Sequence, residues 1–144
     1  MKVLVINGPN LNLLGSRQTE IYGKKTLDGI TRSVRKAYPK AHFHFFQSNS
    51  EGEIIDEIHT AVEGDYTGVI INPGAYSHYS YAIRDALSAL KVPVIEVHLS
   101  NIHKREEFRQ KSVISAVCTG VVSGFGETSY ILAVQALMDM MRKR

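Results

Sequence analysis

The sequence is poor in the residues that form disulfides and thiolate metal sites, because it holds one cysteine in 144 residues. A single cysteine excludes an internal disulfide and is typical of a reducing compartment. Long apolar runs are missing as well, since none approaches the ~18 consecutive residues of a membrane-spanning helix. The opening run Lys2–Ile6 turns polar at Asn7 and is too short for a signal peptide. We therefore expect a soluble, cytoplasmic protein with no membrane partner.

A basic face is also missing. Lysine and arginine number 17 against 14 acidic residues, which gives a net charge of +3. Arg142, Lys143 and Arg144 supply three positive charges, so the rest of the chain is formally neutral. Nucleic-acid-binding domains usually carry a basic patch on a folded face. Basic residues after a helix are explained more simply by the helix dipole, and we expect no nucleic-acid partner.

The usual nucleotide and metal signatures do not occur. No G-x-G-x-x-G follows the first apolar run and no G-x-x-x-x-G-K-[ST] is present, so the common phosphate-binding loops are missing. No acidic cluster follows that run, which argues against a magnesium-dependent phosphoacceptor domain. The six histidines show no H-E-x-x-H or comparable spacing. The motifs therefore indicate neither a nucleotide cofactor nor a metal site.

What is present is an ordinary globular composition, with 44% hydrophobic and 22% charged residues. This length supports one hydrophobic core, so we expect residues 1–144 to form a single domain. Short apolar runs alternate with segments of helical periodicity, separated mostly by glycine or proline. The expected strands are 2–7, 41–47, 68–71, 94–98 and about 116–122. The expected helices start near 26, 51 (with a capping box formed by Ser50 and Glu53), 79 and 127, and a short helical turn is expected near 104–109.

This alternation predicts an α/β fold. Strands that are apolar without strict alternation are typical of a parallel sheet with helices on both faces. Right-handed crossovers then make a three-layer, flavodoxin-like sandwich with a five-stranded parallel sheet the simplest topology.

In open parallel sheets, ligands bind beyond the carboxyl ends of the strands. Three expected strands end there in polar residues: the first in Asn7, the third in Asn72, and the fourth in Glu96 and His98, with Ser100 just beyond. An asparagine after a strand is also a common turn residue, so each one alone is equally well explained by the turn. Three polar strand ends at one edge favour a binding site.

The segment from Gly8 to Lys25 has no clear helical or strand pattern. Unstructured segments of this length inside a compact domain are usually functional lids. The segment carries Arg17 and Tyr22, with Gly15 and Gly23 as candidate hinges. A tyrosine in such a loop is well explained as an apolar anchor. Beside an arginine, which keeps its charge, it could instead act as a phenolate base.

Taken together, these residues lie in motifs that closely resemble the type II 3-dehydroquinate dehydratases. The matching segments are 6–15 (INGPNLNLLG), Arg17, 20–23 (EIYG), 46–49 (FQSN), 71–78 (INPGAYSH), 82–86 (AIRDA), 93–101 (PVIEVHLSN), 105–109 (REEFR) and 124–126 (GFG). Each segment alone is moderately specific, whereas all of them in this order are very specific. The resemblance covers nearly the whole chain.

The resemblance implies the anti elimination of water from 3-dehydroquinate to give 3-dehydroshikimate through an enolate, as part of the shikimate pathway to chorismate and the aromatic amino acids. It implies a hydro-lyase that uses no metal, no cofactor and no Schiff base. It also implies a homododecamer built from four trimers.

Five catalytic residues carry over from the family's motifs. Tyr22 would remove the proton next to the ketone, and Arg17 would hold Tyr22 as a phenolate. Asn10 would help to bind the water that stabilises the enolate. His98 would protonate the leaving hydroxyl, with Glu96 orienting its ring.

The implied substrate-binding residues lie on the same segments and on the helix expected near 79–90. Asp85 would reach the substrate of a neighbouring subunit. The residues that would hold the substrate within one chain are Asn72, Gly74, His78, Leu99, Ser100 and Arg109.

Two other functions remain open from the sequence. A flavin mononucleotide-binding module without catalysis would use the same fold, but the missing phosphate-binding loops count against it. A structural or scaffolding protein would keep the strands and helix faces, but it would have no need to combine Arg17, Tyr22, His98 and Arg109.

Overall fold

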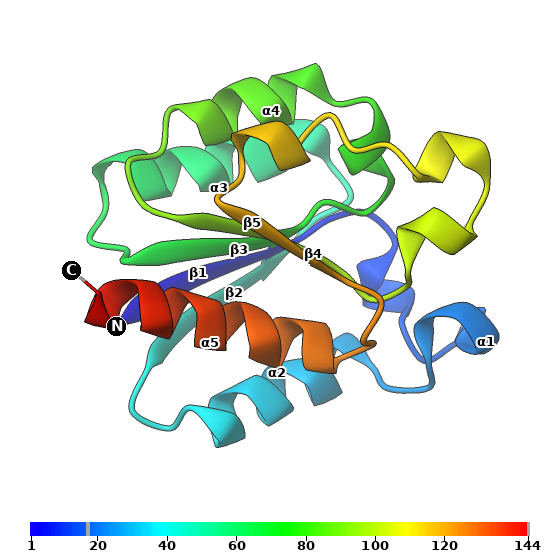
Figure 1. The fold of residues 1–144 in the computed structure, drawn as a ribbon, viewed down its shortest axis with the longest axis horizontal. Coiled ribbons are helices and arrows are strands. Elements are labelled where there is room, and N and C mark those ends of the chain that lie inside the picture. Colours follow the sequence, from blue (N-terminus) through cyan, green and yellow to red (C-terminus); the bar gives the residue numbers. More distant parts are fainter. Residues whose placement is uncertain (17, 144) are drawn as a thin grey trace.

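The computed structural model describes residues 1–16 and 18–143, which form a parallel sheet between two layers of helices (Figure 1). The strands are β1 (Lys2–Asn7), β2 (His42–Gln47), β3 (Gly68–Asn72), β4 (Val94–His98) and β5 (Gly120–Ser123), in the spatial order β2-β1-β3-β4-β5. The helices are α1 (Thr19–Tyr22), α2 (Leu27–Ala37), α3 (Glu51–Glu63), α4 (Tyr81–Ser88) and α5 (Thr128–Arg142). This strand order is the flavodoxin-like one, so the expected fold class is confirmed.

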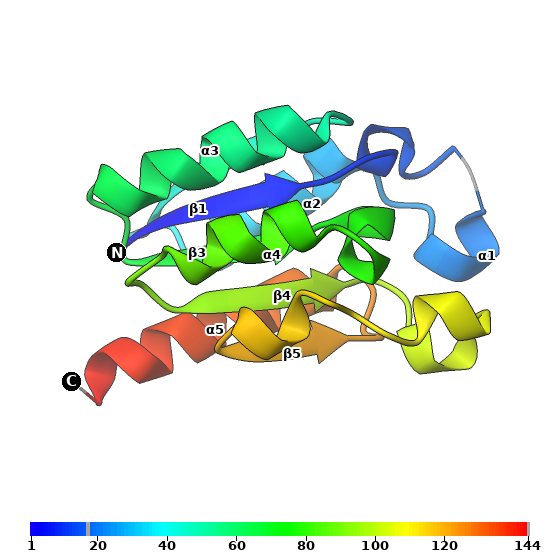
Figure 2. The same ribbon diagram turned by 90° about the horizontal axis from the view of Figure 1, so that it is seen from above.

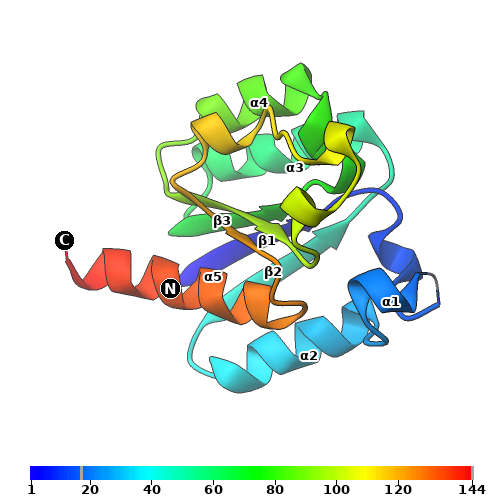
Figure 3. The same ribbon diagram turned by 45° about the vertical axis from the view of Figure 1, so that its right-hand side comes forward.

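The sheet separates two layers of helices (Figures 1 and 3), and an apolar core lies on each of its faces. On one face, Val5 and Ile70 belong to a buried cluster with Val134 of α5, and α2 completes this layer. On the other face, Ile71 lies in a second cluster with Ile58 of α3 and residues of α4. Consecutive strand residues therefore serve opposite cores, which explains why the strands read as continuous apolar runs. No helix within residues 1–16 and 18–143 is long and apolar enough to cross a membrane.

All strands run in the same direction, so their carboxyl ends meet at one edge, where α1 and several short helical turns gather (Figure 2). The first turns of three helices are fixed by hydroxyl residues. Thr26, Ser50 and Ser80 each accept a hydrogen bond from the backbone N–H three residues later, at the starts of α2, α3 and α4.

The capping box expected at the start of α3 is only half formed. The Ser50 hydroxyl accepts the Glu53 N–H at 3.3 Å, as expected. The Glu53 carboxylate, however, accepts from the Ser48 hydroxyl instead of the Ser50 N–H, which itself donates to Ser48 at 2.9 Å. The hydroxyl of Ser48 therefore stands between the two groups that the motif pairs directly.

The segment 8–25 contains more regular structure than expected. Leu11–Leu13 forms a turn of 3-10 helix, and α1 forms one turn between two glycines with positive φ, Gly15 and Gly23. Helices this short show no apolar periodicity, so no pattern in the sequence predicts them. Leu11 and Leu14 are buried in the apolar cluster that also contains residues of α2 and α5, and they hold the segment against this core.

Two expected boundaries are wrong. The fifth strand starts at Gly120 rather than near residue 116, because Ser115–Val117 forms a turn of 3-10 helix whose first N–H donates to the Ser112 hydroxyl at 3.1 Å. Helix α4 covers Tyr81–Ser88 rather than about 79–90, and its later start follows from Ser80, which is its N-terminal cap. The turn expected near 104–109 is divided into two 3-10 turns, Ile102–Lys104 and Glu107–Arg109.

The loops after β1 and β3 pack directly against each other. The Gly8 N–H donates to the Asn72 carbonyl at 2.8 Å. A Cβ atom on Gly8 would lie only 2.5 Å from the carbonyl oxygen of Pro73. Gly74 has a φ of +58° and faces Pro9 in the same way, with 3.1 Å between its potential Cβ and the Pro9 oxygen. The two Gly/Pro turns thus allow two strand ends to approach at the edge where ligands bind.

We expect Gly8→Ala to lower the free energy of unfolding by about 2 kcal/mol, because the new methyl group meets rigid backbone. Urea unfolding at fixed protein concentration measures this change. Gly52→Ala in α3 is the matched control, since the nearest atom to its new Cβ lies 3.8 Å away. Alanine is also favoured over glycine inside a helix by about 1 kcal/mol, so the control should be neutral or stabilising. Equal unfolding midpoints for the two variants would contradict the packing described.

Candidate active site

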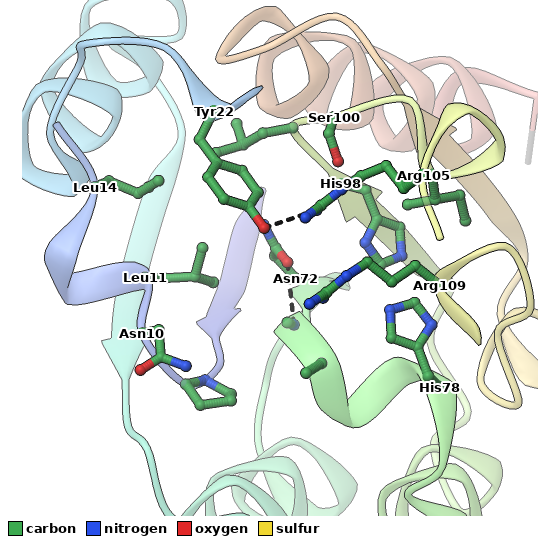
Figure 4. A pocket seen from close by; sticks show the side chains of 15 residues that line it. Asn10, Leu11, Leu14, Tyr22, Asn72, His78, His98, Ser100, Arg105 and Arg109 are labelled. Carbon is green, nitrogen blue, oxygen red and sulfur yellow. Dashed lines mark hydrogen bonds between the residues drawn. The ribbon is translucent and has the colours of Figure 1, made fainter. Parts of the chain in front are cut away.

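A cavity of about 180 Å3 lies beyond the carboxyl ends of β1, β3 and β4 (Figure 4). Its walls come from the loops after these strands, from α1 and from the segment 98–109. Most of the site residues expected from the sequence lie on its lining: Asn10, Tyr22, Asn72, Gly74, His78, His98, Leu99, Ser100 and Arg109. The fold therefore brings residues from distant parts of the chain around one small hollow.

The cavity is electropositive. Arg105 and Arg109 line it together with His78 and His98, and none of the described lining residues is acidic. Guanidinium groups bind carboxylates in a fixed, bidentate geometry. A small molecule that carries a carboxylate fits this lining. Within residues 1–16 and 18–143, no group of three or more His, Cys, Asp or Glu side chains is placed to hold a metal ion.

Tyr22, at the end of α1, points its hydroxyl into this cavity (Figure 4). The Nη1 atom of Arg105 donates to that hydroxyl at 2.7 Å, and the same guanidinium lies 5.1 Å from the centre of the tyrosine ring. A cationic donor at this distance stabilises negative charge on the phenol oxygen. The cation that the sequence suggested, Arg17, lies outside the described residues, so the pairing of Arg17 with Tyr22 stays a prediction.

Arg105 is a site residue that the sequence reasoning missed. It lies in the segment 105–109, where only Arg109 had received a role. The two arginines are four residues apart, across the break between two 3-10 turns, and both reach the cavity. The signal that could have identified Arg105 was its place in the same short segment as Arg109. The contact itself joins residues 83 positions apart, which no local pattern reveals.

His98 and Glu96 form a buried pair at the end of β4. They are two residues apart on a strand, so both side chains lie on the same face of the sheet. The Nε2 atom of His98 lies 3.3 Å from Oε2 of Glu96, and the two residues are only 6% and 0% exposed. Glu96 does not line the cavity but supports His98 from behind.

Two serines complete the environment of Glu96. Ser112 donates to Oε1 at 2.6 Å, and Ser115 donates to Oε2. Burial has the largest effect and raises the pKa of the Glu96 carboxyl. The contact with His98 and the two serine hydroxyls outweigh burial and lower the pKa below its ordinary value. Glu96 is therefore a buried carboxylate, and neither serine was identified from the sequence.

His78 lies on the 3-10 turn Gly74–His78 and faces the cavity with one ring nitrogen. Its Nδ1 atom lies 2.7 Å from the backbone oxygen of Lys111. Because a carbonyl only accepts hydrogen bonds, Nδ1 carries the proton and Nε2 is left as an acceptor in the neutral ring. Burial lowers the pKa of His78, and the neighbouring charges of His98 and Arg109 lower it further, although the Lys111 carbonyl opposes them.

Asn10 stands at the turn where the chain leaves the Gly8-Pro9 loop. It adopts a left-handed conformation with a φ of 67°, which asparagine tolerates better than most residues. The side chain of Asn49 holds this turn by accepting the Asn10 N–H at 3.0 Å, and Gln47 donates to the Gly8 carbonyl at 3.2 Å. The end of β2 thus positions Asn10 at the cavity.

Asp85 is not brought to the cavity of its own chain. It is exposed on α4 and is absent from the described lining. The role suggested for it, contact with the substrate of a neighbouring subunit, stays a prediction.

The chain matches a family model described as "Dehydroquinase class II" over residues 1–138. It is 57% identical over 142 residues to a protein named 3-dehydroquinate dehydratase from Caldicellulosiruptor bescii, covering 97% of this chain and 98% of that protein. A protein of the same name from Pelodictyon phaeoclathratiforme is 55% identical over 141 residues, covering 97% of this chain and 93% of its own length.

A crystal structure of a type II dehydroquinase from Butyrivibrio crossotus has the same fold, with a TM-score of 0.93 and 47% sequence identity. That match covers 95% of this chain and 97% of the other. The family-model match over residues 1–138 includes every segment that lines the cavity.

The neutral His78 ring predicts a pH dependence of stability. Its folded-state pKa is lowered, so between that value and the ~6.5 of an unfolded histidine only the unfolded chain binds the proton. This contribution to stability is present above ~6.5 and is lost as the pH falls toward the folded-state value. Urea unfolding of wild type and His78→Asn at pH 7.5 and 5.5 checks this. The variant should lose less stability on acidification, and an equal loss in both proteins would contradict the assignment.

Proposed function

The chain belongs to the class II dehydroquinases and is a 3-dehydroquinate dehydratase, and we propose that it removes water from 3-dehydroquinate by anti elimination through an enolate. The product is 3-dehydroshikimate, and the reaction belongs to the shikimate pathway toward chorismate and the aromatic amino acids. The observation that carries the mechanism is the Arg105–Tyr22 hydrogen bond of 2.7 Å at the edge of a cationic cavity.

Tyr22 is the base of the first step. Its ionised oxygen takes a proton from the carbon next to the ketone, and the electron pair of the broken C–H bond moves to the carbonyl oxygen as an enolate. Arg105 holds the phenol oxygen in place and stabilises its charge before the proton arrives. Arg17 is the second cation of this step, and Asn10 binds the water that stabilises the enolate.

His98 is the acid of the second step. When the enolate collapses, the C–O bond of the leaving hydroxyl breaks, and His98 supplies the proton that turns this hydroxyl into water. Glu96 keeps the imidazole oriented and balances its charge, because the carboxylate is buried and held by Ser112 and Ser115. In Figure 4, Tyr22 and His98 approach the cavity from separate walls, which suits a base and an acid that act on different substrate atoms.

The remaining lining residues bind the substrate. Arg109 supplies a guanidinium for its carboxylate, and the backbone amides of Leu99 and Ser100 donate to the same group. The free Nε2 of neutral His78 accepts from a substrate hydroxyl, while Asn72 and the Gly74 backbone complete the polar contacts.

A flavin-binding module is the alternative that the fold alone would allow. The cavity is small for a flavin nucleotide, and Tyr22 is the one aromatic ring, other than histidine, on its described lining. A scaffolding role leaves the convergence of Tyr22, His98, Arg105 and Arg109 without a purpose. Neither alternative is favoured.

We also propose that the protein is a cytoplasmic homododecamer of four trimers, in which Asp85 reaches the site of a neighbouring subunit. The exposure of Asp85 on α4, away from the cavity of its own chain, supports such a role.

Tyr22→Phe should lower turnover by about 1,000-fold, because a positioned base contributes 10²–10⁴-fold, while KM should stay within about tenfold. The absorbance of the conjugated enone of 3-dehydroshikimate follows the reaction after addition of 3-dehydroquinate. Tyr66→Phe is the matched control, because it removes the same atom from a tyrosine away from the cavity. Near-normal turnover in Tyr22→Phe would exclude Tyr22 as the base, and no enone from the wild type would refute the proposed activity.

Sedimentation velocity should show a particle of many subunits at working concentration. Asp85→Ala should then raise KM by about tenfold with little change in sedimentation, because the lost contact is to substrate and one such interaction is worth roughly 1.4 kcal/mol. A fully active monomer would contradict both the assembly and the shared site.

A further inference from the structure

Tyr130 of α5 lies under the cavity without lining it. It is 1% exposed, and its hydroxyl reaches the carboxyl ends of two neighbouring strands. The register of β1 and β3 pairs Asn7 directly with Asn72. Both side chains point to the α5 face of the sheet, since Val5 and Ile70, two residues earlier, pack there. The Tyr130 hydroxyl donates to Oδ1 of Asn7 at 2.6 Å and accepts from Nδ2 of Asn72 at 3.1 Å.

These hydrogen bonds form a series that runs from the Gly74 N–H through Asn72, Tyr130 and Asn7 to the Phe46 carbonyl. The backbone groups at its two ends fix the direction of each hydrogen bond. The backbone N–H of Gly74 can only donate, so the Asn72 atom 3.2 Å away is the carbonyl oxygen. Asn72 must then turn its NH2 group toward Tyr130, whose hydroxyl accepts there and gives its own proton to Asn7. At the other end, the NH2 group of Asn7 faces the backbone oxygen of Phe46 at 3.5 Å.

Burial keeps this hydroxyl protonated. It raises the pKa of Tyr130 far above the ordinary tyrosine value, although the hydrogen bond from Asn72 opposes the shift. The hydroxyl therefore remains protonated at neutral pH and can donate to Asn7. Tyr130 thus differs from Tyr22, whose hydroxyl faces the cavity and receives the Arg105 guanidinium.

Asn72 connects this series of hydrogen bonds to the cavity in which the substrate would bind. It lines the cavity, and the Tyr130 contact takes one of its two N–H bonds. Within residues 1–16 and 18–143, the other N–H has no protein acceptor. We propose that Tyr130 is a positioning residue that locks the Asn72 amide with an N–H toward the cavity, so that this point of the site selects an oxygen acceptor of the substrate. The proposal rests on the proposed function, because the substrate's oxygens are what Asn72 would bind.

Without the Tyr130 hydroxyl, the Asn72 amide keeps only the Gly74 N–H as a hydrogen-bond partner among the described residues, and its N–H toward the cavity is held less firmly. Tyr130→Phe should therefore raise KM for 3-dehydroquinate about tenfold with a smaller change in kcat, as expected for one hydrogen bond lost mainly from substrate binding. Tyr38→Phe is the matched control. It removes a hydroxyl that also bonds to α5, donating to the Ile131 carbonyl at 3.0 Å, but remote from the cavity. The control should lower stability and leave KM and kcat within about twofold.

Steady-state kinetics of the intact oligomer gives these constants, and wild-type turnover separately tests the proposed function. The decisive measurement is a double-mutant cycle, because Tyr130 acts through Asn72. On an Asn72→Ala background, Tyr130→Phe should no longer change KM. A folded Tyr130→Phe enzyme with the KM of Tyr38→Phe would overturn the proposal, as would additive effects in the cycle. If Tyr130→Phe does not fold, Asn7→Ser is the second variant. It removes the amide oxygen that accepts the Tyr130 proton, and Asn7 is not on the described lining of the cavity. The same KM criterion then decides.

Discussion

Burial of polar groups at the carboxyl ends of three adjacent strands is the constraint on which this site depends. Four such side chains are at most 6% exposed: Asn7, Asn72, Glu96 and His98. A buried polar group without a hydrogen bond costs about 1–3 kcal/mol, and a buried charge costs more. Partners must therefore come from elsewhere in the chain. Ser112 and Ser115 meet the carboxylate, and Tyr130 meets both asparagines. The segment after Arg109 and helix α5 thus support the site, although neither contributes a residue to the described lining of the cavity.

The two tyrosines of the site show how environment assigns different roles to one side chain. Tyr22 lies half-buried on a one-turn helix, where the Arg105 guanidinium donates a hydrogen bond to its hydroxyl oxygen. Tyr130 lies fully buried between two neutral amides, and burial raises its pKa. The first arrangement suits proton transfer, and the second suits a fixed hydrogen-bond direction. In the proposed mechanism, Tyr22 is therefore the base, and Tyr130 holds the Asn72 amide beneath the cavity.

The sequence predicted what depends on local chemistry. Apolar runs bounded by glycine and proline placed β4 at its observed limits, and Thr26 marked the start of α2. Contacts between distant segments could not be predicted from local patterns in the sequence. The boundary of β5 failed because Ser112 and Ser115 bind a carboxylate on another strand, and Arg105 was missed because its partner lies 83 residues away. Tyr130 was correctly placed on the apolar face of the last helix, but periodicity says nothing about where a hydroxyl at the end of a buried ring finds its partners.

The strand period of two divides the site between the faces of the sheet. On β4, residues 96 and 98 point to the α3/α4 side, where Ser112 and Ser115 hold the carboxylate behind His98. On β1 and β3, residues 7 and 72 point to the opposite side, where Tyr130 joins them. His98 and Glu96 are thus supported from the side of one layer of helices, and the Asn7 and Asn72 amides are supported from the other. A shift of one residue in any of these strands would reverse its side chains. The register of the sheet, fixed by two apolar cores, is therefore also what sets the geometry of the chemistry.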